Sequence, residues 1–402
     1  MNAPRRAARR RAPHPAAAPV RVALTGLTAA LGLSAAALGA VSLRMARTVV
    51  TPAGRVPDVR IVSLDPAAQT ITLERTDDTS LPGRYGLFTT GTSDYLRLGS
   101  VVKEDGAAVT RKLLTHVPAD SRLAPAAAFS GWYYDKPEDL QIPYRNALIG
   151  TPVGPCPAWE FPAAIDSDVW VIQVHGRGTT RSEALRAVPV FHELGITSLL
   201  VSYRNDGEAP RSRTGTYALG ATEWRDVDAA IGYARRQGAR RILLMGWSMG
   251  GAIALQTEFS SPHRDVIAGL ILESPVADWR TVLRYQSRLL RLPAIVLTFA
   301  QQILGSDWGA VLTRSGSAIP LDSLDAVARA GELRHPVLVL HSDDDGFVPS
   351  DASHALADAR PDLVTMETFG AARHTKLWNY DETRWTRVIQ DWVRARGLAT
   401  EE

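Results

Sequence analysis

Residues 241–251, RILLMGWSMGG, decide the fold, because a serine, Ser248, stands in them between two bulky residues and within a frame of glycines. The residues before the turn are apolar after an opening arginine, which predicts a buried parallel strand. The residues that follow, GAIALQTEFS, are small and then helix-forming, so a helix is expected there. Strand, GxSxG turn and helix together place the hydroxyl of Ser248 on a sharp, exposed elbow.

Apolar runs alternate with helical stretches from about Asp168 onward. The strand candidates are residues 169–174, 198–203, 241–245, 266–272, 336–341 and 363–368. Between them, residues 221–236 (ATEWRDVDAAIGYARR) carry their apolar side chains on one stripe, and the closing helix around Trp385 repeats the pattern. This alternation predicts an α/β fold with a mostly parallel sheet covered by helices on both faces.

Polar residues follow four of these strands, and ligands of such sheets bind at the carboxyl ends of the strands. Ser248 follows the strand at 241–245, and three aspartates, residues 343–345, follow the strand at 336–341. His374 is the histidine that lies in a loop after the last strand, and His175-Gly176-Arg177-Gly178 follows the strand at 169–174. A nucleophile, an acid and a base are therefore expected on one rim.

In these residues the chain resembles the α/β-hydrolase superfamily over about residues 140–398, because Ser248, Asp345 and His374 follow the family's order of nucleophile, acid and histidine. The resemblance implies a serine hydrolase in which Ser248 attacks a carbonyl carbon, His374 transfers the proton and Asp345 orients the imidazole. It also implies an oxyanion hole made by the backbone N–H groups of Arg177 and Met249. Gly178 is the alternative to Arg177.

The acid loop departs from the family's pattern. His341-Ser342 stands where the family often has His-Gly, and three aspartates follow. Asp345 is favoured because DGFVP (345–349) matches the usual acid-x-x-Val-Pro spacing, whereas the two preceding aspartates are expected to cap the loop. Glu273 is the alternative acid, since a minority of the family place the acid after the preceding strand.

The sequence contains no pattern typical of a metal site, a cofactor site or a nucleic-acid-binding surface. The single cysteine, Cys156, excludes an intramolecular disulfide and a Cys-based zinc cluster, and no histidine pair has the zinc spacing with glutamate. GRGTTR (176–181) ends in arginine where the dinucleotide fingerprint needs glycine. Residues 1–49 hold eight arginines and no acidic residue, so the rest of the chain is net acidic despite the overall charge of +3. We expect no metal, no cofactor and no nucleic-acid partner.

The N-terminal residues predict a single-pass membrane anchor. Residues 1–21 form a basic tail, and residues 22–43 carry no charge. Twenty-two helical residues span about 33 Å, enough for the hydrocarbon core of a bilayer. The upstream arginines predict a cytoplasmic N-terminus and a catalytic domain on the extracytoplasmic side of the cytoplasmic membrane. Secretion after signal cleavage near Ala37 is the alternative.

A separate β-rich region is expected over residues 50–139, before a hydrolase-like domain over residues 140–398. Residues 59–114 alternate apolar and polar side chains in short runs, broken by Asp-Pro, Pro-Gly and Asp-Gly. Proline and alanine over 118–128 indicate a connector, and residues 146–163 (NALIGTPVGPCPAWEFPA) predict a hairpin. The β-rich region contains no evident catalytic constellation.

The substrate class stays open at this level. Residues 279–319 are rich in leucine, which predicts either a lid over an acyl-binding pocket or core helices. A small-molecule or lipid-like carboxylic ester is the expected substrate, but thioesters and peptides share the same chemistry. The alternatives are an acyltransferase or peptidase with the same triad, and a non-catalytic scaffold that keeps the fold.

Overall fold

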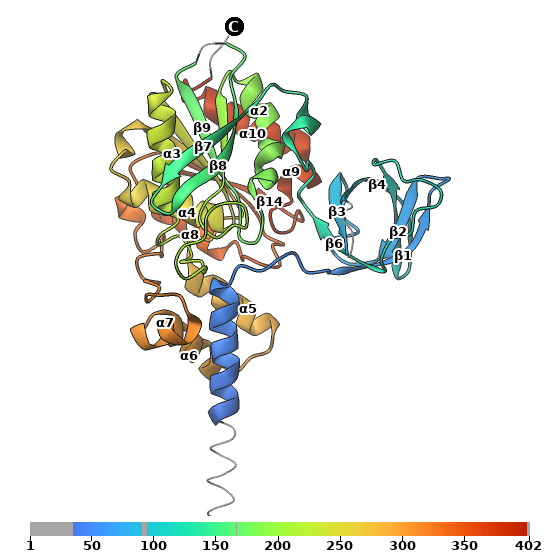
Figure 1. Ribbon diagram of the computed structural model, residues 1–402, viewed down its shortest axis with the longest axis horizontal. Coiled ribbons are helices and arrows are strands. Elements are labelled where there is room, and N and C mark those ends of the chain that lie inside the picture. Colours follow the sequence, from blue (N-terminus) through green and yellow to red (C-terminus); the bar gives the residue numbers. More distant parts are fainter. Residues whose placement is uncertain (1–34, 91–94, 166, 400–402) are drawn as a thin grey trace, which may run out of the picture.

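The computed structural model describes residues 35–90, 95–165 and 167–399, which form two bodies side by side (Figure 1). The larger is a layered α/β body, and the smaller is a closed β-barrel. A helix over residues 35–50 precedes both bodies and runs beside α5 of the larger one.

An eight-stranded sheet in the order β14-β13-β12-β11-β9-β10-β8-β7 organises the larger body. Strands β9 to β14 are parallel, and β7 and β8 form an antiparallel hairpin at one edge. The predicted α/β class, the strands and the hairpin are confirmed. The strands are β7 (Arg145–Thr151), β8 (Gly154–Phe161), β9 (Val169–Val174), β10 (Thr197–Val201), β11 (Arg241–Trp247), β12 (Ile267–Glu273), β13 (Val337–Ser342) and β14 (Val364–Phe369).

Both faces of this sheet are covered, because successive side chains of a strand point to opposite faces. Along β11, Ile242 and Leu244 join one cluster of buried residues, whereas Leu243 and Met245 join the other. The first cluster includes residues of α3 (Trp224–Arg236), α4 (Met249–Ser260) and α8 (Asp351–Ala359). The second includes residues of α2 (Val188–Glu193), α9 (Leu377–Tyr380) and α10 (Glu382–Arg394).

Three helices are inserted between β12 and β13, where the sequence predicts either a lid or core helices. They are α5 (Trp279–Leu289), α6 (Ala294–Leu304) and α7 (Asp307–Thr313). Asp278 caps α5 by accepting hydrogen bonds from the N–H groups of Arg280 and Thr281. The helices project from the larger body on the side where the helix over residues 35–50 lies (Figure 1).

The predicted anchor, residues 22–43, lies only partly within the described residues, since residues 22–34 are outside them. The described helix continues beyond the expected boundary to Val50, and Ala46 and Val50 are fully buried in the core of the α/β body. Within the described ranges, no helix has both the length and the apolar character needed to cross a membrane.

The smaller body is a six-stranded barrel in the order β1-β2-β5-β4-β3-β6. It confirms the expected β-rich region but corrects the connector predicted over residues 118–128, because β6 starts at Ala126 and pairs with both β1 and β3. Closing a barrel removes the unpaired edges of its sheet. The strands are β1 (Val59–Asp65), β2 (Thr70–Glu74), β3 (Tyr85–Thr89), β4 (Tyr95–Asp105), β5 (Ala108–Leu113) and β6 (Ala126–Ser130).

Candidate active site

Ser248 occupies a strained turn between β11 and α4. Its backbone has φ 52° and ψ −116°, a conformation that a residue with a side chain adopts only when its surroundings enforce it. A Cβ on Gly246 would lie 2.4 Å from the Gly250 carbonyl oxygen, and one on Gly250 would lie 2.0 Å from the Val174 carbonyl oxygen. The glycines of GxSxG are therefore required by close backbone approach on both sides of the serine.

His374 lies between Ser248 and Asp345, although the three residues come from three separate loops. Its Nε2 is 3.1 Å from the Ser248 Oγ, and its Nδ1 is 2.7 Å from the Asp345 Oδ2. The structure therefore brings the predicted nucleophile, base and acid together in hydrogen-bonding order. This geometry allows His374 to accept the serine proton through Nε2 while Asp345 fixes the orientation of the ring.

The Asp345 carboxylate is buried, and donor groups of the protein form hydrogen bonds to both of its oxygens. Its Oδ1 accepts hydrogen bonds from the N–H groups of Phe347 and Val348, both at 2.8 Å. Burial alone would raise its pKa, but the neighbouring His374 and His341 hold the pKa of this carboxyl well below its usual range. Asp345 is therefore ionised throughout the neutral pH range.

Glu273, the alternative acid, binds side chains other than His374. Its carboxylate accepts hydrogen bonds from the indole N–H groups of Trp247 at 3.1 Å and Trp385 at 2.8 Å, and it is completely buried. The Arg186 guanidinium lies 3.7 Å from its other oxygen. The geometry favours Asp345 over Glu273 as the partner of the histidine.

The loop with the predicted oxyanion donors lies against the serine. A Cβ built on Gly176, the residue before Arg177, would be 3.4 Å from the Ser248 Cβ, so the loop packs directly against the serine. Met249 follows the serine as the first residue of α4, where N–H groups have no partner inside the helix. Gly178, the alternative donor, lies in the same loop with a φ of 73°.

His175, in the same loop, is held in a structural arrangement. Its Nε2 lies 3.1 Å from Asp206, its Nδ1 lies 2.8 Å from the Gly176 carbonyl oxygen, and its ring stacks on Tyr203 at 4.4 Å. Both ring nitrogens are thus occupied, and the side chain is fully buried. These contacts give His175 a structural role in the loop.

A cavity of about 380 Å³ opens beside Ser248. One wall consists of residues from α5 and from the loop before it: Val276, Trp279, Val282 and Leu283. Val41, Met45 and Val49 of the helix over residues 35–50 form another, a contribution that sequence reasoning missed because it assigned most of this segment to a membrane. The cavity walls are largely apolar, as is usual for pockets that bind hydrophobic groups.

Arg177 ties the helix over residues 35–50 to the site. Its guanidinium donates hydrogen bonds to the carbonyl oxygens of Val49 and Thr51, both at 2.9 Å, and to that of Thr48. These carbonyl groups end the helix and lack partners within it, so a cationic side chain stabilises them. The predicted oxyanion residue therefore also fixes a wall of the cavity.

The described ranges contain no group of three or more His, Cys, Asp or Glu side chains placed to hold a metal ion. Cys156 is buried, and burial raises the pKa of its thiol to about 11.

Two family models match the chain in different places. Residues 171–389 match the model described as the alpha/beta hydrolase family. Residues 60–130, which correspond to the barrel, match a domain of unknown function. No curated protein matches the chain significantly in sequence.

The larger body of the chain was compared with solved protein structures. An esterase from Pyrococcus furiosus is 16% identical over 65% of this chain and 94% of its own, with a TM-score of 0.51. A thermophilic esterase from Thermogutta terrifontis, solved with malate bound, is 20% identical over 63% of this chain and 99% of its own, with a TM-score of 0.44. At these identities, the likeness of the first establishes a common fold and nothing finer.

Proposed function

We propose that this chain, which belongs to the alpha/beta hydrolase family, is a serine hydrolase. It cleaves carboxylic esters through an acyl-enzyme on Ser248. The observation that carries the proposal is the continuous hydrogen-bonded series from Asp345 through His374 to Ser248, with distances of 2.7 and 3.1 Å. Such a series activates an otherwise weak hydroxyl nucleophile.

The reaction proceeds in two halves. Ser248 Oγ attacks the ester carbonyl carbon while His374 Nε2 takes its proton, and the resulting oxyanion accepts hydrogen bonds from the N–H groups of Arg177 and Met249. The carbon–oxygen bond to the leaving alcohol then breaks, and the alcohol takes the proton from His374. A water molecule repeats the sequence on the acyl-enzyme, which releases the carboxylic acid and restores the serine.

The cavity next to the nucleophile supports a proposal for the substrate class. An acyl chain bound to Ser248 would lie against Val276, Trp279 and Leu283 on one side and Met45 on the other. Each Å² of apolar surface that is removed from water contributes about 25 cal/mol to the free energy of binding. Apolar walls therefore favour an apolar acyl group over a charged or strongly polar one. We propose an ester with an aliphatic or lipid-like acyl chain.

A fluorophosphonate probe tests this function, because it reacts with a serine that its base has activated. We expect purified full-length protein to become labelled on Ser248, and the Ser248→Ala and His374→Ala variants to remain unlabelled. Folded wild-type protein that takes no label at neutral pH would instead support the non-catalytic scaffold. Adding an alcohol acceptor to an ester assay then separates a hydrolase, which yields free acid, from an acyltransferase, which yields a new ester.

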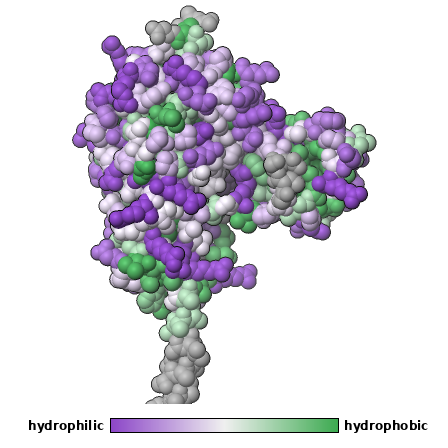
Figure 2. Space-filling view, viewed as in Figure 1, coloured by the Kyte–Doolittle hydropathy of each residue, from purple (hydrophilic) through white to green (hydrophobic). Residues whose placement is uncertain are grey.

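We also propose that residues 22–43 anchor the chain in the cytoplasmic membrane with Ser248 on the extracytoplasmic side. The arginine-rich tail and the uncharged segment support this orientation. Exposed apolar side chains lie on the inserted helices, including Trp308 and Val311 of α7 and Leu290, which follows α5 and lines the cavity. Figure 2 shows apolar surface over this end of the molecule.

A membrane-impermeant fluorophosphonate distinguishes the possible locations. In intact cells whose outer layers admit the probe, we expect labelling of Ser248, with the labelled protein in the membrane fraction. Label that appears only after lysis would reverse the orientation. Labelled protein in the medium would indicate secretion after signal cleavage.

A further inference from the structure

The loop that carries His374 adopts a backbone conformation that needs outside support. It connects β14 to α9, and the residues on either side of the histidine, Arg373 and Thr375, have φ values of 60° and 50°. Side-chain-bearing residues avoid this left-handed region unless neighbouring groups fix them there. The support must come from elements packed against the loop.

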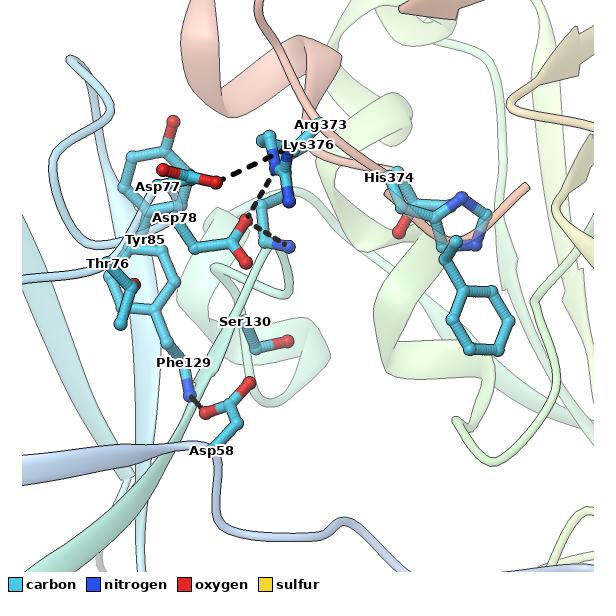
Figure 3. Close-up of polar contacts among 12 residues, drawn as sticks. Asp58, Thr76, Asp77, Asp78, Tyr85, Phe129, Ser130, Arg373, His374 and Lys376 are labelled. Carbon is cyan, nitrogen blue, oxygen red and sulfur yellow. Dashed lines mark hydrogen bonds and ion pairs between the residues drawn. The ribbon is translucent and has the colours of Figure 1, made fainter. Parts of the chain in front are cut away.

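The barrel supplies part of this support through the turn between β2 and β3. Asp78 in that turn lies 3.1 Å from the Lys376 Nζ and 3.8 Å from the Arg373 Nε, and Asp77 lies 3.9 Å from the Arg373 guanidinium. Figure 3 shows the two aspartates facing Arg373 and Lys376, which flank His374 in sequence. The side chains of Arg373 and Lys376 are 19% and 13% exposed and that of Asp78 is 32% exposed, so solvent screens the two ion pairs of Asp78 less than pairs at an open surface. The Asp77 side chain is 85% exposed, so its pair with Arg373 contributes little.

Arg373 extends the connection to the acid loop. Its guanidinium lies 3.1 Å from the Asp344 carboxylate and donates to the Asp344 carbonyl oxygen at 3.2 Å. Asp344 directly precedes Asp345, the partner of His374. One arginine thus links the barrel, the histidine loop and the acid loop.

A second cation connects the barrel to the other end of the same loop. Arg186 donates hydrogen bonds to the carbonyl oxygens of Gly131, which follows β6 of the barrel, and Thr375, at 3.0 and 2.8 Å. A Cβ on Gly131 would lie 2.6 Å from the Thr375 carbonyl oxygen. The two backbone segments are therefore so close that only glycine fits at position 131. The barrel therefore contacts the loop on both sides of His374.

We propose that the barrel is a working part of the active site and that Asp78 is its positioning residue, holding the His374 loop so that the imidazole reaches Ser248 and Asp345 together. This inference rests on the proposed hydrolase function. Asp78 acts through Lys376 and Arg373 and touches neither the nucleophile nor the cavity. Its loss should affect the rate of the chemical step, since small misplacements of a catalytic group reduce turnover strongly, and should leave substrate binding unchanged.

The test compares Asp78→Asn, which keeps the size of the side chain and removes its charge, with Asp78→Glu, which restores the charge. Asp105→Asn is the matched control, because Asp105 is a barrel aspartate in an open ion pair with Lys103 and its side chain is 75% exposed. Full-length proteins are assayed for kcat and KM on a p-nitrophenyl ester, for the rate of fluorophosphonate labelling, and for thermal unfolding.

We expect Asp78→Asn to lower kcat and the labelling rate about tenfold or more with KM unchanged within about twofold, and Asp78→Glu to recover part of both. Asp105→Asn should match wild type. A folded Asp78→Asn variant with wild-type kcat and labelling rate would overturn the positioning role, as would a loss that only follows the fraction of unfolded protein. Wild-type protein that is folded yet unlabelled would reject the hydrolase function itself, a result distinct from either.

Discussion

The indole N–H of Trp247 donates a hydrogen bond to the carboxylate of Glu273 at 3.1 Å, directly behind the turn that carries Ser248. The Ser248 N–H in turn donates to the Glu273 carbonyl oxygen at 3.0 Å. Both the side chain and the main chain of Glu273 therefore support the nucleophile turn. Asp345 contacts the histidine, whereas Glu273 supports the turn, so substitutions of the two residues should have different effects.

Asp345→Asn and Glu273→Gln should differ in what they damage. We expect Asp345→Asn to lower kcat about 10⁴-fold, because an amide cannot hold the histidine in the required tautomer. Glu273→Gln should lower the free energy of unfolding by about 1–3 kcal/mol through loss of a buried charged acceptor, with kcat within about fivefold of wild type. Steady-state kinetics and urea unfolding of both variants measure the difference. The acid assignment is wrong if Glu273→Gln has the lower kcat.

Ser248→Ala and His374→Ala should each reduce ester turnover by about three orders of magnitude or more, and the double variant should lose little beyond either single one. Members of a catalytic triad act as a unit, so their losses are not additive. Turnover of a p-nitrophenyl ester measures the effect, and circular dichroism shows whether the variants remain folded. Additive losses would indicate that the two side chains act independently.

The stability provided by Asp345 should depend on pH in a defined direction. Burial would raise the pKa of Asp345, but His374 and His341 lower it well below its usual range. A carboxyl whose pKa is depressed by folding stabilises the protein above its unfolded pKa of about 3.9, and this contribution is lost as the pH falls through the folded pKa. The difference in free energy of unfolding between wild type and Asp345→Asn should therefore be present at neutral pH and decrease below about pH 4. A difference that grows below pH 4 would contradict the assigned environment.

Narrowing the cavity should shorten the preferred acyl chain. Leu283 is buried on the cavity wall, so Leu283→Trp should reduce kcat/KM for an octanoate ester far more than for an acetate ester. Each methylene that loses its buried position costs about 0.8 kcal/mol, so four of them amount to roughly a hundredfold effect or more. Leu148→Trp is the control, since Leu148 is 67% exposed on β7 and does not line the cavity. Equal losses on both esters would place the acyl chain elsewhere.

The sequence predicted those parts of the site that depend on local chemistry. The GxSxG turn requires glycines because of backbone contacts within a few ångströms, and the acid and histidine follow strands whose carboxyl ends share one rim. Ser248, Asp345 and His374 could therefore be proposed from the sequence, through their order along the chain and the resemblance to the α/β-hydrolase superfamily.

Contacts between distant segments were not recognisable. Asp78 and Lys376 are almost 300 residues apart, and their pairing depends on how the barrel packs on the larger body, for which the sequence has no local pattern. The contact between the helix over residues 35–50 and the cavity was missed for another reason. An apolar segment has the same composition whether lipid or protein covers it, so its contact with the cavity appears only in the fold.

The helix over residues 35–50 is at once a wall of the acyl cavity and the continuation of the uncharged segment that begins at residue 22 of the sequence. A shortened enzyme that starts after Val50, made for convenience of purification, would keep Ser248, Asp345 and His374 but lack Val41, Met45 and Val49 on the cavity wall. Such an enzyme should accept short esters and discriminate poorly among longer ones. Substitutions in this helix are constrained by ligand selectivity as well as by hydrophobicity, and the substrate preference of the protein is properly measured on the whole chain.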